Sequence, residues 1–298
     1  MLLGLGVGVL SGLLGVGGGV LITPALHILG LPMPAAVATS LTQMVGSSLS
    51  GSYKHFKQGH VSIRLALLFG LPSLLGLVLG RHILLAFPEE KADERLSIIY
   101  LVLMAYVLFE LMRKMREGSR PQVKLLPRWA RFGPRLDLGP ERPSVAIIPS
   151  LIAGVIVGLA SSLTGLGGGF LYIPALTLLG ACSIKQAIGT SLATVFLSSV
   201  FGAVIYGAAG VSNIPAALLL MLGSVVGAQL GAIAAHRAKN KRLERLFLLL
   251  VISAMVSMGL KLFAWDMAAH VLLFGSGTSI VSIALWSTFR VQKSNPLQ

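Results

Sequence analysis

The chain has 298 residues, of which 55% are hydrophobic and only 11% charged, with a formal net charge of +14 and a single cysteine. Soluble domains carry about 25% charged residues, so this composition excludes a water-soluble globule and indicates an integral membrane protein. One cysteine also excludes a disulfide framework and any multi-cysteine metal site.

The apolar segments, taken in chain order, predict an all-α membrane protein. The first covers residues 1–53, which contain no Lys, Arg, Asp or Glu. The further segments cover residues 65–80, 96–112, 145–180, 184–206, 212–235, 246–264 and 267–289. Most of them approach the roughly 20 residues that a membrane-spanning helix needs. Residues 113–144 form the one long polar connection and carry several prolines and arginines, which is typical of a solvated linker.

The sequence also contains an internal duplication. Residues 13–30 and 163–180 are identical at 11 of 18 positions with an offset of 150, and after one inserted residue the match continues with an offset of 151. We therefore expect two copies of one membrane unit. The predicted organisation is a first repeat at 1–112, a cytoplasmic basic linker at 113–144, a second repeat at 145–264, and a final transmembrane helix with a cytoplasmic tail at 265–298.

The positive charges predict an orientation, because loops rich in Lys and Arg stay in the cytoplasm. An excess of basic residues is found in joints 54–64, 113–142 and 237–245 and in the tail, whereas joints 81–95, 207–212 and 261–266 have none. If every apolar segment crossed the membrane once, the basic linker and the basic joint 237–245 would fall on opposite sides of the membrane. The charge pattern is satisfied if residues 145–180 form a re-entrant or broken helical hairpin whose legs of about a dozen residues are too short to span.

The N-terminal segment fits the same interpretation. Each repeat is then one Gly-rich hairpin plus three transmembrane helices, with one extra helix at the C-terminus. An odd number of crossings per repeat makes the second repeat inverted relative to the first. Paired discontinuous helices in inverted repeats are typical of secondary transporters, which bind substrate near the midplane between the halves.

Two glycine clusters are the first candidate binding residues: Gly17, Gly18 and Gly19 in one hairpin, and Gly167, Gly168 and Gly169 in the other. Each cluster begins a half-helix that runs to a proline, Pro24 or Pro174, so its free backbone N–H groups and positive helix end would attract an anion. The alternative interpretation is close helix packing through small residues. Repetition of the motif at equivalent sites favours binding.

Hydroxyl and amide side chains near the breaks are the second set of candidates: Thr39, Ser40, Gln43, Ser162, Thr164, Thr190, Ser191 and Thr194. They supply uncharged hydrogen-bond donors for an anion. The alternative is that they join neighbouring helices by hydrogen bonds. Both interpretations stay open.

Other polar residues have two interpretations each. Lys185 either guides an anion or serves the membrane topology, and Cys182 either contacts a sulfur substrate or packs as a small residue. His27, His55, His82 and His270 either take part in proton coupling or lie at the membrane boundary. No H-E-x-x-H motif or paired intramembrane aspartate occurs, so we expect no enzyme, no metal and no cofactor.

The duplicated motif resembles one transporter family. G-[VL]-G-G-G-x-[LI], followed by Pro24-Ala25-Leu26 or Pro174-Ala175-Leu176 and then by A-[VI]-[AG]-T-S-L, is similar to the sulfite exporter TauE/SafE family of membrane permeases. The resemblance covers nearly the whole chain. It implies export of small sulfur-containing anions, such as sulfite or organosulfonates, across the bacterial inner membrane. The motif leaves the choice of anion open.

The sequence therefore predicts a secondary transporter that works by alternating access. Its expected partners are a small sulfur-containing oxyanion, the lipid bilayer and coupled protons, with no nucleic acid, while the oligomeric state stays open. The alternatives are a channel or carrier for an unrelated small solute, and a membrane scaffold that docks a partner through the basic linker.

Overall fold

The computed structural model describes residues 1–117, 134–136, 144–179, 182–238 and 240–262, with short pieces between 265 and 279. The described residues form ten helices and a two-stranded antiparallel ladder: α1 (Leu2–Leu14), α2 (Gly19–Ile28), α3 (Met33–Lys57), α4 (Ile63–Ala86), α5 (Glu89–Glu117), β1 (Arg135–Leu136), β2 (Val145–Ala146), α6 (Ile147–Thr164), α7 (Gly169–Leu178), α8 (Ile184–Ala208), α9 (Ile214–Arg237) and α10 (Asn240–Leu262).

The long helices confirm the all-α membrane class. Six of them hold stretches long and apolar enough to cross a bilayer: α4, residues 91–113 of α5, α6, α8, α9 and residues 245–262 of α10. On α4, large side chains at every fourth position are exposed along the outer face, at Leu67, Leu71, Leu75 and Leu79. Such a stripe is costly in water and favourable in lipid. The protein is thus a multi-pass membrane protein.

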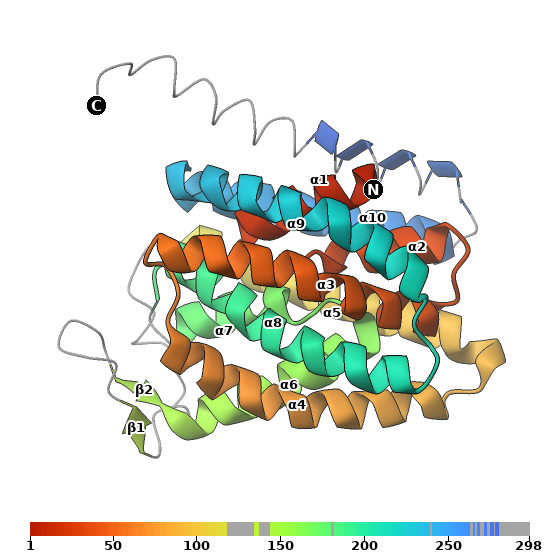
Figure 1. Cartoon of the computed structure of the whole chain (residues 1–298), viewed down its shortest axis with the longest axis horizontal. Coiled ribbons are helices and arrows are strands. Elements are labelled where there is room, and N and C mark those ends of the chain that lie inside the picture. The colour runs from red at the N-terminus through yellow and green to blue at the C-terminus, as the bar shows by residue number, and fades with distance from the viewer. Residues whose placement is uncertain are drawn as a thin grey trace.

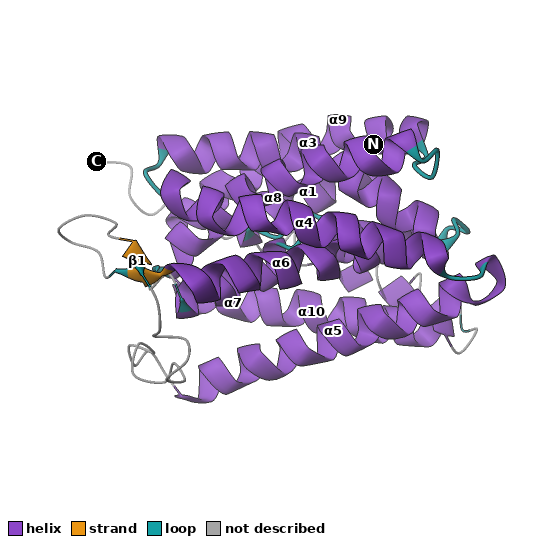
Figure 2. Cartoon of the chain, turned by 90° about the horizontal axis from the view of Figure 1, so that it is seen from below, coloured by secondary structure: helices purple, strands orange, loops and turns teal. Residues whose placement is uncertain are grey.

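The polar helix α3 lies in the middle of the bundle, between α9 and α8, and α8 separates it from α4 (Figure 1). Seven of its hydroxyl and amide side chains are buried: Thr39, Ser40, Thr42, Gln43, Ser47, Ser48 and Ser50. A helix of this composition is costly against lipid, and its central position surrounds it with protein instead. Helices α5 and α10 lie side by side along one edge of the bundle (Figure 2).

The two central helices, α3 and α8, run in opposite directions. Leu41 contacts Gly202, and Gly51 contacts Leu192 further along. With the offset of 151, Leu41 corresponds to Leu192 and Gly51 to Gly202. The same contact is therefore made twice, once by each half, as it is across a twofold axis.

The first helix of each hairpin packs on a helix of the other half. Helix α1 lies parallel to α9, where Gly4, Gly8 and Gly12 meet the backbone of Leu220, Ser224 and Ala228 in turn. Helix α6 lies parallel to α4 in the same manner, with Gly154 against Phe69 and Gly158 against Ser73. Small residues four positions apart allow this backbone contact. The two halves are consequently interlocked.

This packing makes a testable prediction at Gly8. A Cβ atom there would lie 2.6 Å from the Ser224 Cα, whereas nothing lies within 4 Å of a Cβ at Gly6 on the same helix. Overpacking a tight site costs about 1–3 kcal/mol. We expect Gly8→Ala to lower the melting temperature in detergent by several degrees and Gly6→Ala to leave it unchanged. Equal effects of the two substitutions would contradict this packing.

The lengths of the hairpin legs differ from the prediction in one case. Helices α1, α2 and α7 have 13, 10 and 10 residues, but α6 has 18. The expected leg of about a dozen residues is wrong for α6, which rises about 27 Å and is long enough to span. Its first turns begin directly at β2, where the polar linker ends. Helix α5 likewise continues to Glu117, past the expected boundary at 112.

Candidate functional site: two packed helix breaks

The chain leaves helical geometry at two equivalent points, between α1 and α2 and between α6 and α7. In the first break, Gly15, Gly17 and Gly18 have φ angles of 75°, 79° and 99°. In the second, the φ angles of Gly165, Gly167 and Gly168 are 68°, 68° and 71°. Glycine adopts this left-handed region without the steric penalty of other residues. The duplicated glycine motif thus produces a duplicated break.

The two breaks pack against each other. Gly169 faces the first break, where a Cβ atom would lie 2.7 Å from the Gly15 carbonyl oxygen, and Gly19 faces the Gly165 carbonyl in the same manner. Met44 and Val195 touch both breaks, and they are equivalent residues halfway along α3 and α8. The glycines at 17–19 and 167–169 are therefore brought together at the buried centre.

Serines hold each break from the opposite half. The Ser40 hydroxyl of α3 donates to the Gly165 carbonyl at 3.0 Å, and Thr23 donates to the same oxygen at 3.2 Å. The Ser191 hydroxyl of α8, which is equivalent to Ser40, donates to the Gly15 carbonyl. The carbonyl groups at the ends of α1 and α6 are satisfied in this manner, because a helix end leaves its last carbonyls without intrahelical partners.

The N–H groups at the starts of α2 and α7 remain available. The amides of Leu21 and Ile22 donate to the Gly18 carbonyl, and Leu171 and Tyr172 donate to that of Gly168. The preceding amides, those of residues 18–20 and 168–170, have no acceptor in the described part of the chain. Free amides at the positive end of a helix are a general anion-binding arrangement.

Gln43 lies beside the first break and is fully buried. Its amide nitrogen donates to the Ser224 hydroxyl at 2.6 Å, and that hydroxyl donates onward to the Met221 carbonyl. Its amide oxygen has no hydrogen-bond partner in the described chain and would lie 3.7 Å from a Cβ atom at Gly18. Among the predicted polar side chains, Gln43 thus keeps a free hydrogen-bond acceptor, its amide oxygen, at the break.

Ser11 and Ser161 form a polar pair near the breaks, and the sequence alone indicated only one of the two. The Ser11 and Ser161 hydroxyls are buried one turn before the two breaks and have no partner in the described residues. Ser11 was noted from the sequence as a polar residue that flanks the first break, Ser161 was not noted, and neither was assigned to the binding site. The offset of 150 between them is the signal that could have identified the pair.

The other predicted hydroxyl residues contact backbone. Thr39 accepts from the amide of Asn213 at 2.9 Å, and its equivalent Thr190 accepts from that of Ser62 at 3.0 Å. Each of these contacts joins the two halves at the start of α9 or α4. The remaining three donate to carbonyls: Thr164 to Ala160, Thr194 to Thr190 and Ser162 to Leu77. Thr39, Thr190 and Ser162 therefore join neighbouring segments, whereas Thr164 and Thr194 bond to carbonyls of their own helices.

The residues with two interpretations lie away from the breaks. The Lys185 ammonium donates to the His236 carbonyl at 2.6 Å, at the end of α9. Cys182 is half-buried in the connection between α7 and α8. His27 and His82 bind carbonyls of neighbouring residues, those of Leu31 and Val78. His55 binds the Gly12 carbonyl, and His270 lies outside the described residues.

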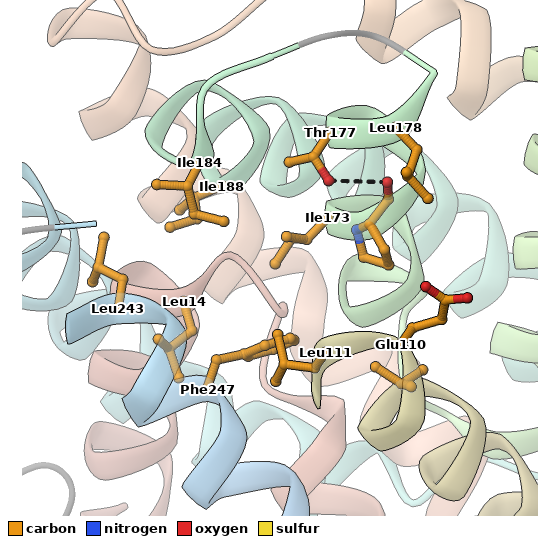
Figure 3. Close-up of a pocket in the computed structure, with 12 residues that line it drawn as sticks. Leu14, Glu110, Leu111, Ile173, Thr177, Leu178, Ile184, Ile188, Leu243 and Phe247 are labelled. Atoms are coloured by element: carbon orange, nitrogen blue, oxygen red, sulfur yellow. Dashed lines mark hydrogen bonds between the residues drawn. The ribbon is translucent and has the colours of Figure 1, made fainter. Parts of the chain in front are cut away.

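A separate pocket of about 40 Å³ lies on the outer side of the second hairpin (Figure 3). Its wall is formed mainly by apolar side chains such as Leu14, Ile173 and Phe247, with Thr177 directed toward the Pro174 carbonyl. Glu110 is the one ionisable residue among those that line it. A carboxylate repels an anion, so this pocket does not suit the predicted substrate.

The electrostatic character of the centre follows from which side chains are buried. Among the described residues, the buried polar side chains are serines, threonines, Gln43 and His55, with no Lys, Arg, Asp or Glu. An anion at the breaks would meet backbone amide donors and the positive helix ends. Binding without a fixed opposite charge permits release as well as entry.

Comparison with known proteins agrees with this architecture. The sequence profile described as sulfite exporter TauE/SafE matches residues 1–258. The chain belongs to the TauE/SafE family. Like other members of that family, this TauE/SafE protein is a membrane transporter rather than an enzyme.

Its relatives in other organisms match over most of both chains. A probable membrane transporter protein of Xylella fastidiosa is 31% identical over 84% of the TauE/SafE chain and 90% of its own length. Two Bacillus subtilis proteins, the probable membrane transporter proteins YunE and YjnA, are each 28% identical and cover 85% and 88% of the chain, with 93% and 98% of their own lengths. No solved structure gives a significant match.

Proposed function

We propose that this protein is a secondary transporter that exports small sulfur-containing anions, such as sulfite or organosulfonates, across the inner membrane. The observation that carries the proposal is the pair of helix breaks. The amides of residues 18–20 and 168–170 lie in two breaks that pack on each other at the buried centre, and none of them has a backbone acceptor in the described chain. Ser40 and Ser191 donate their hydroxyl hydrogens to the carbonyls of the breaks and the free oxygen of Gln43 is an acceptor, so the amides are the donors that an anion would meet. A small oxyanion accepts hydrogen bonds of this kind.

Alternating access is the proposed mechanism, with two inverted repeats as the moving parts. The antiparallel pair α3 and α8 supports this mechanism. The contact of Leu41 with Gly202 is repeated by the equivalent contact of Leu192 with Gly51. Backbone that leaves the helix at membrane depth needs protein or a polar cavity around it. Rocking of one half against the other would expose the breaks first to one side and then to the other.

The directions of the helices also support the proposed topology. Contacts between Ser62 and Thr190 place the joint 58–62 and the start of α8 at one end of the bundle. Contacts between Thr39 and Asn213 place the start of α9 at the opposite end. Joint 54–64 is basic and joint 207–212 is uncharged. The proposal therefore assigns the first end, the linker and the C-terminal tail to the cytoplasm.

A labelling experiment tests this orientation. In a Cys182→Ser background, Ser212→Cys should react with an impermeant thiol reagent added outside intact cells, because joint 207–212 is expected to face outward. Lys57→Cys, an exposed position at the other end, should react only after the membrane is permeabilised. Equal labelling of both positions from outside would overturn the topology.

The function itself is tested by flux in proteoliposomes. Radiolabelled sulfite should be carried with saturable kinetics, compete with thiosulfate and a short sulfonate, and respond to a pH gradient if protons are coupled. High conductance without saturation would favour the channel alternative. A protein that is folded but carries none of these anions would favour a carrier for another solute. Partner capture through the basic linker, independent of the glycines, would favour a scaffold.

A further inference from the structure

Three of the six histidines meet at the end of the bundle assigned to the cytoplasm. His55 lies near the end of α3, His60 in the joint between α3 and α4, and His236 near the end of α9. The ring centres of His55 and His60 are 5.9 Å apart, and those of His60 and His236 are 5.3 Å apart. His55 and His60 are close in the sequence, whereas His236 comes from the other half of the chain. We call these three residues the histidine cluster.

The histidine cluster lies on the seam between the two halves. His55 and His60 belong to the first half and His236 to the second. Gly189 of α8 packs closely here, because a Cβ atom on it would lie 2.7 Å from the His60 carbonyl oxygen and 3.0 Å from the His55 Cβ. Next to it, the Gln58 amide nitrogen donates to the Ala232 carbonyl at 3.3 Å. Opening this end of the bundle would require these contacts to separate.

The opposite end uses an equivalent seam without histidine. His55 corresponds to Tyr206 with the offset of 151. The His55 Nε2 binds the Gly12 carbonyl at 2.8 Å, and the Tyr206 hydroxyl donates to the carbonyl of Ser162 at 2.9 Å. Gly12 and Ser162 are themselves equivalent, with the offset of 150. The same contact therefore uses an imidazole at one end and a phenol at the other.

The remaining two positions show the same asymmetry. His60 corresponds to Val211 and His236 to Leu85. At those equivalent positions the second seam has aliphatic residues. One seam therefore has imidazoles at these positions, and the other has side chains that cannot bind a proton.

The geometry of the cluster fits neutral imidazoles. A carbonyl oxygen only accepts hydrogen bonds, so His55 must carry its hydrogen on Nε2. The Nδ1 atoms of His55 and His60 are both buried without a partner in the described chain, so a proton added there would be a buried donor with no acceptor. Burial, His236 and the Lys185 ammonium lower the pKa of His60. The packed arrangement is therefore that of the unprotonated cluster.

The charged groups around the cluster oppose protonation. Lys185 of α8 is the nearest cation to His60, and further cations flank the cluster on α3, α4 and α9: Lys54, Lys57, Arg64 and Arg237. Of the carboxylates with described contacts, Asp93 accepts from the Met33 amide at the other end of α3, and Glu110 pairs with Arg113. Protonation of the cluster consequently adds positive charge beside existing cations.

We propose that His55, His60 and His236 form a proton-binding site that holds the cytoplasmic end closed when neutral and releases it when protonated. This site supplies the proton coupling of the proposed transporter and rests on that function. The sign follows from linkage: groups whose pKa is lower in the closed state than in the open state favour the closed state at high pH. As the pH falls through the ordinary pKa of histidine, about 6.5, the population of the open state therefore increases.

Distance measurement between spin labels tests the proposal without any substrate. In a Cys182→Ser background, labels at Phe56→Cys and Leu230→Cys report on the seam, since both side chains are exposed and lie on α3 and α9. Their separation should shift to longer values as pH falls from about 8 to about 5.5. The matched pair, Gly207→Cys and Leu79→Cys, occupies the equivalent positions at the other end and should not lengthen.

Substitution of the histidines completes the test. The double variant His60→Asn/His236→Gln, which alters half-exposed and exposed side chains, should lose the acid-induced shift. His55→Tyr, which copies Tyr206, should weaken it. An unchanged shift in the double variant, or no shift in the parent, would overturn the proposal. Sulfite flux in the same proteoliposomes separates the transport function from the proton site. If sulfite is carried but the double variant behaves like the parent, the transport function stands and the proton site does not. If the acid-induced shift occurs without sulfite flux, the proton site stands and sulfite transport does not.

Discussion

Leucine in place of Gly168 is expected to reduce sulfite flux in proteoliposomes by at least about tenfold. Gly168 has a φ angle of 71°, and a Cβ atom there would lie 2.7 Å from the Val157 Cγ1. A residue other than glycine in this region costs about 1–3 kcal/mol, and 1.4 kcal/mol corresponds to a factor of ten. The equivalent Gly18 has a φ angle of 99° and the same relation to Val7, so Gly18→Leu should act alike.

The control for this prediction is Gly207→Leu. Gly207 lies in α8, and nothing lies within 4 Å of a Cβ atom placed on it. This variant should keep the flux of the parent and the same yield of folded protein. If Gly168→Leu is folded and transports at the parental rate, the break is not part of the transport pathway.

Ser191→Ala is expected to destabilise the protein by about 2 kcal/mol, because it leaves the buried Gly15 carbonyl without its hydroxyl donor. Ser40→Ala should cost less, since the Gly165 carbonyl also accepts from Thr23. For a chain of this size, the larger cost lowers the melting temperature by about 3 °C. Thermal unfolding in detergent, followed by loss of soluble monomer, measures the difference.

The comparison of the two serines is informative in itself. Both hydroxyls occupy equivalent positions, so side-chain volume and burial are matched between the variants. Equal shifts in melting temperature would mean that Thr23 does not support the second break. If Thr23 does support it, the double variant Ser40→Ala/Thr23→Val should remove both donors to the Gly165 carbonyl and reproduce the effect of Ser191→Ala.

Several features of the binding region were predictable from local sequence. The glycines at 15–19 and 165–169 mark the breaks because other residues avoid positive φ. Ser40 and Ser191 were selected as polar residues near the breaks, and both contact them. For Thr39 and Thr190 the sequence left binding and helix joining equally open, and their contacts with Asn213 and Ser62 are of the second kind.

Other features were not predictable because they depend on partners remote in sequence. His60 and His236 were not singled out, since nothing in their own segments indicates that their rings lie 5.3 Å apart. The free oxygen of Gln43 depends on Ser224, which binds the nitrogen of the same amide. The length of α6 was misjudged because the end of the polar linker does not reveal where the first helical turn begins.

The sequence by itself determined the membrane class, the duplication and the positions of the two breaks, because hydropathy and glycine content act locally along the chain. Only the tertiary structure decided which helices meet: α1 with α9, α6 with α4, and α3 antiparallel to α8. In a membrane, apolar helices gain little from burial against one another compared with lipid. Their pairing therefore depends on close backbone packing at glycines and on a few interhelical hydrogen bonds, which join residues more than a hundred positions apart.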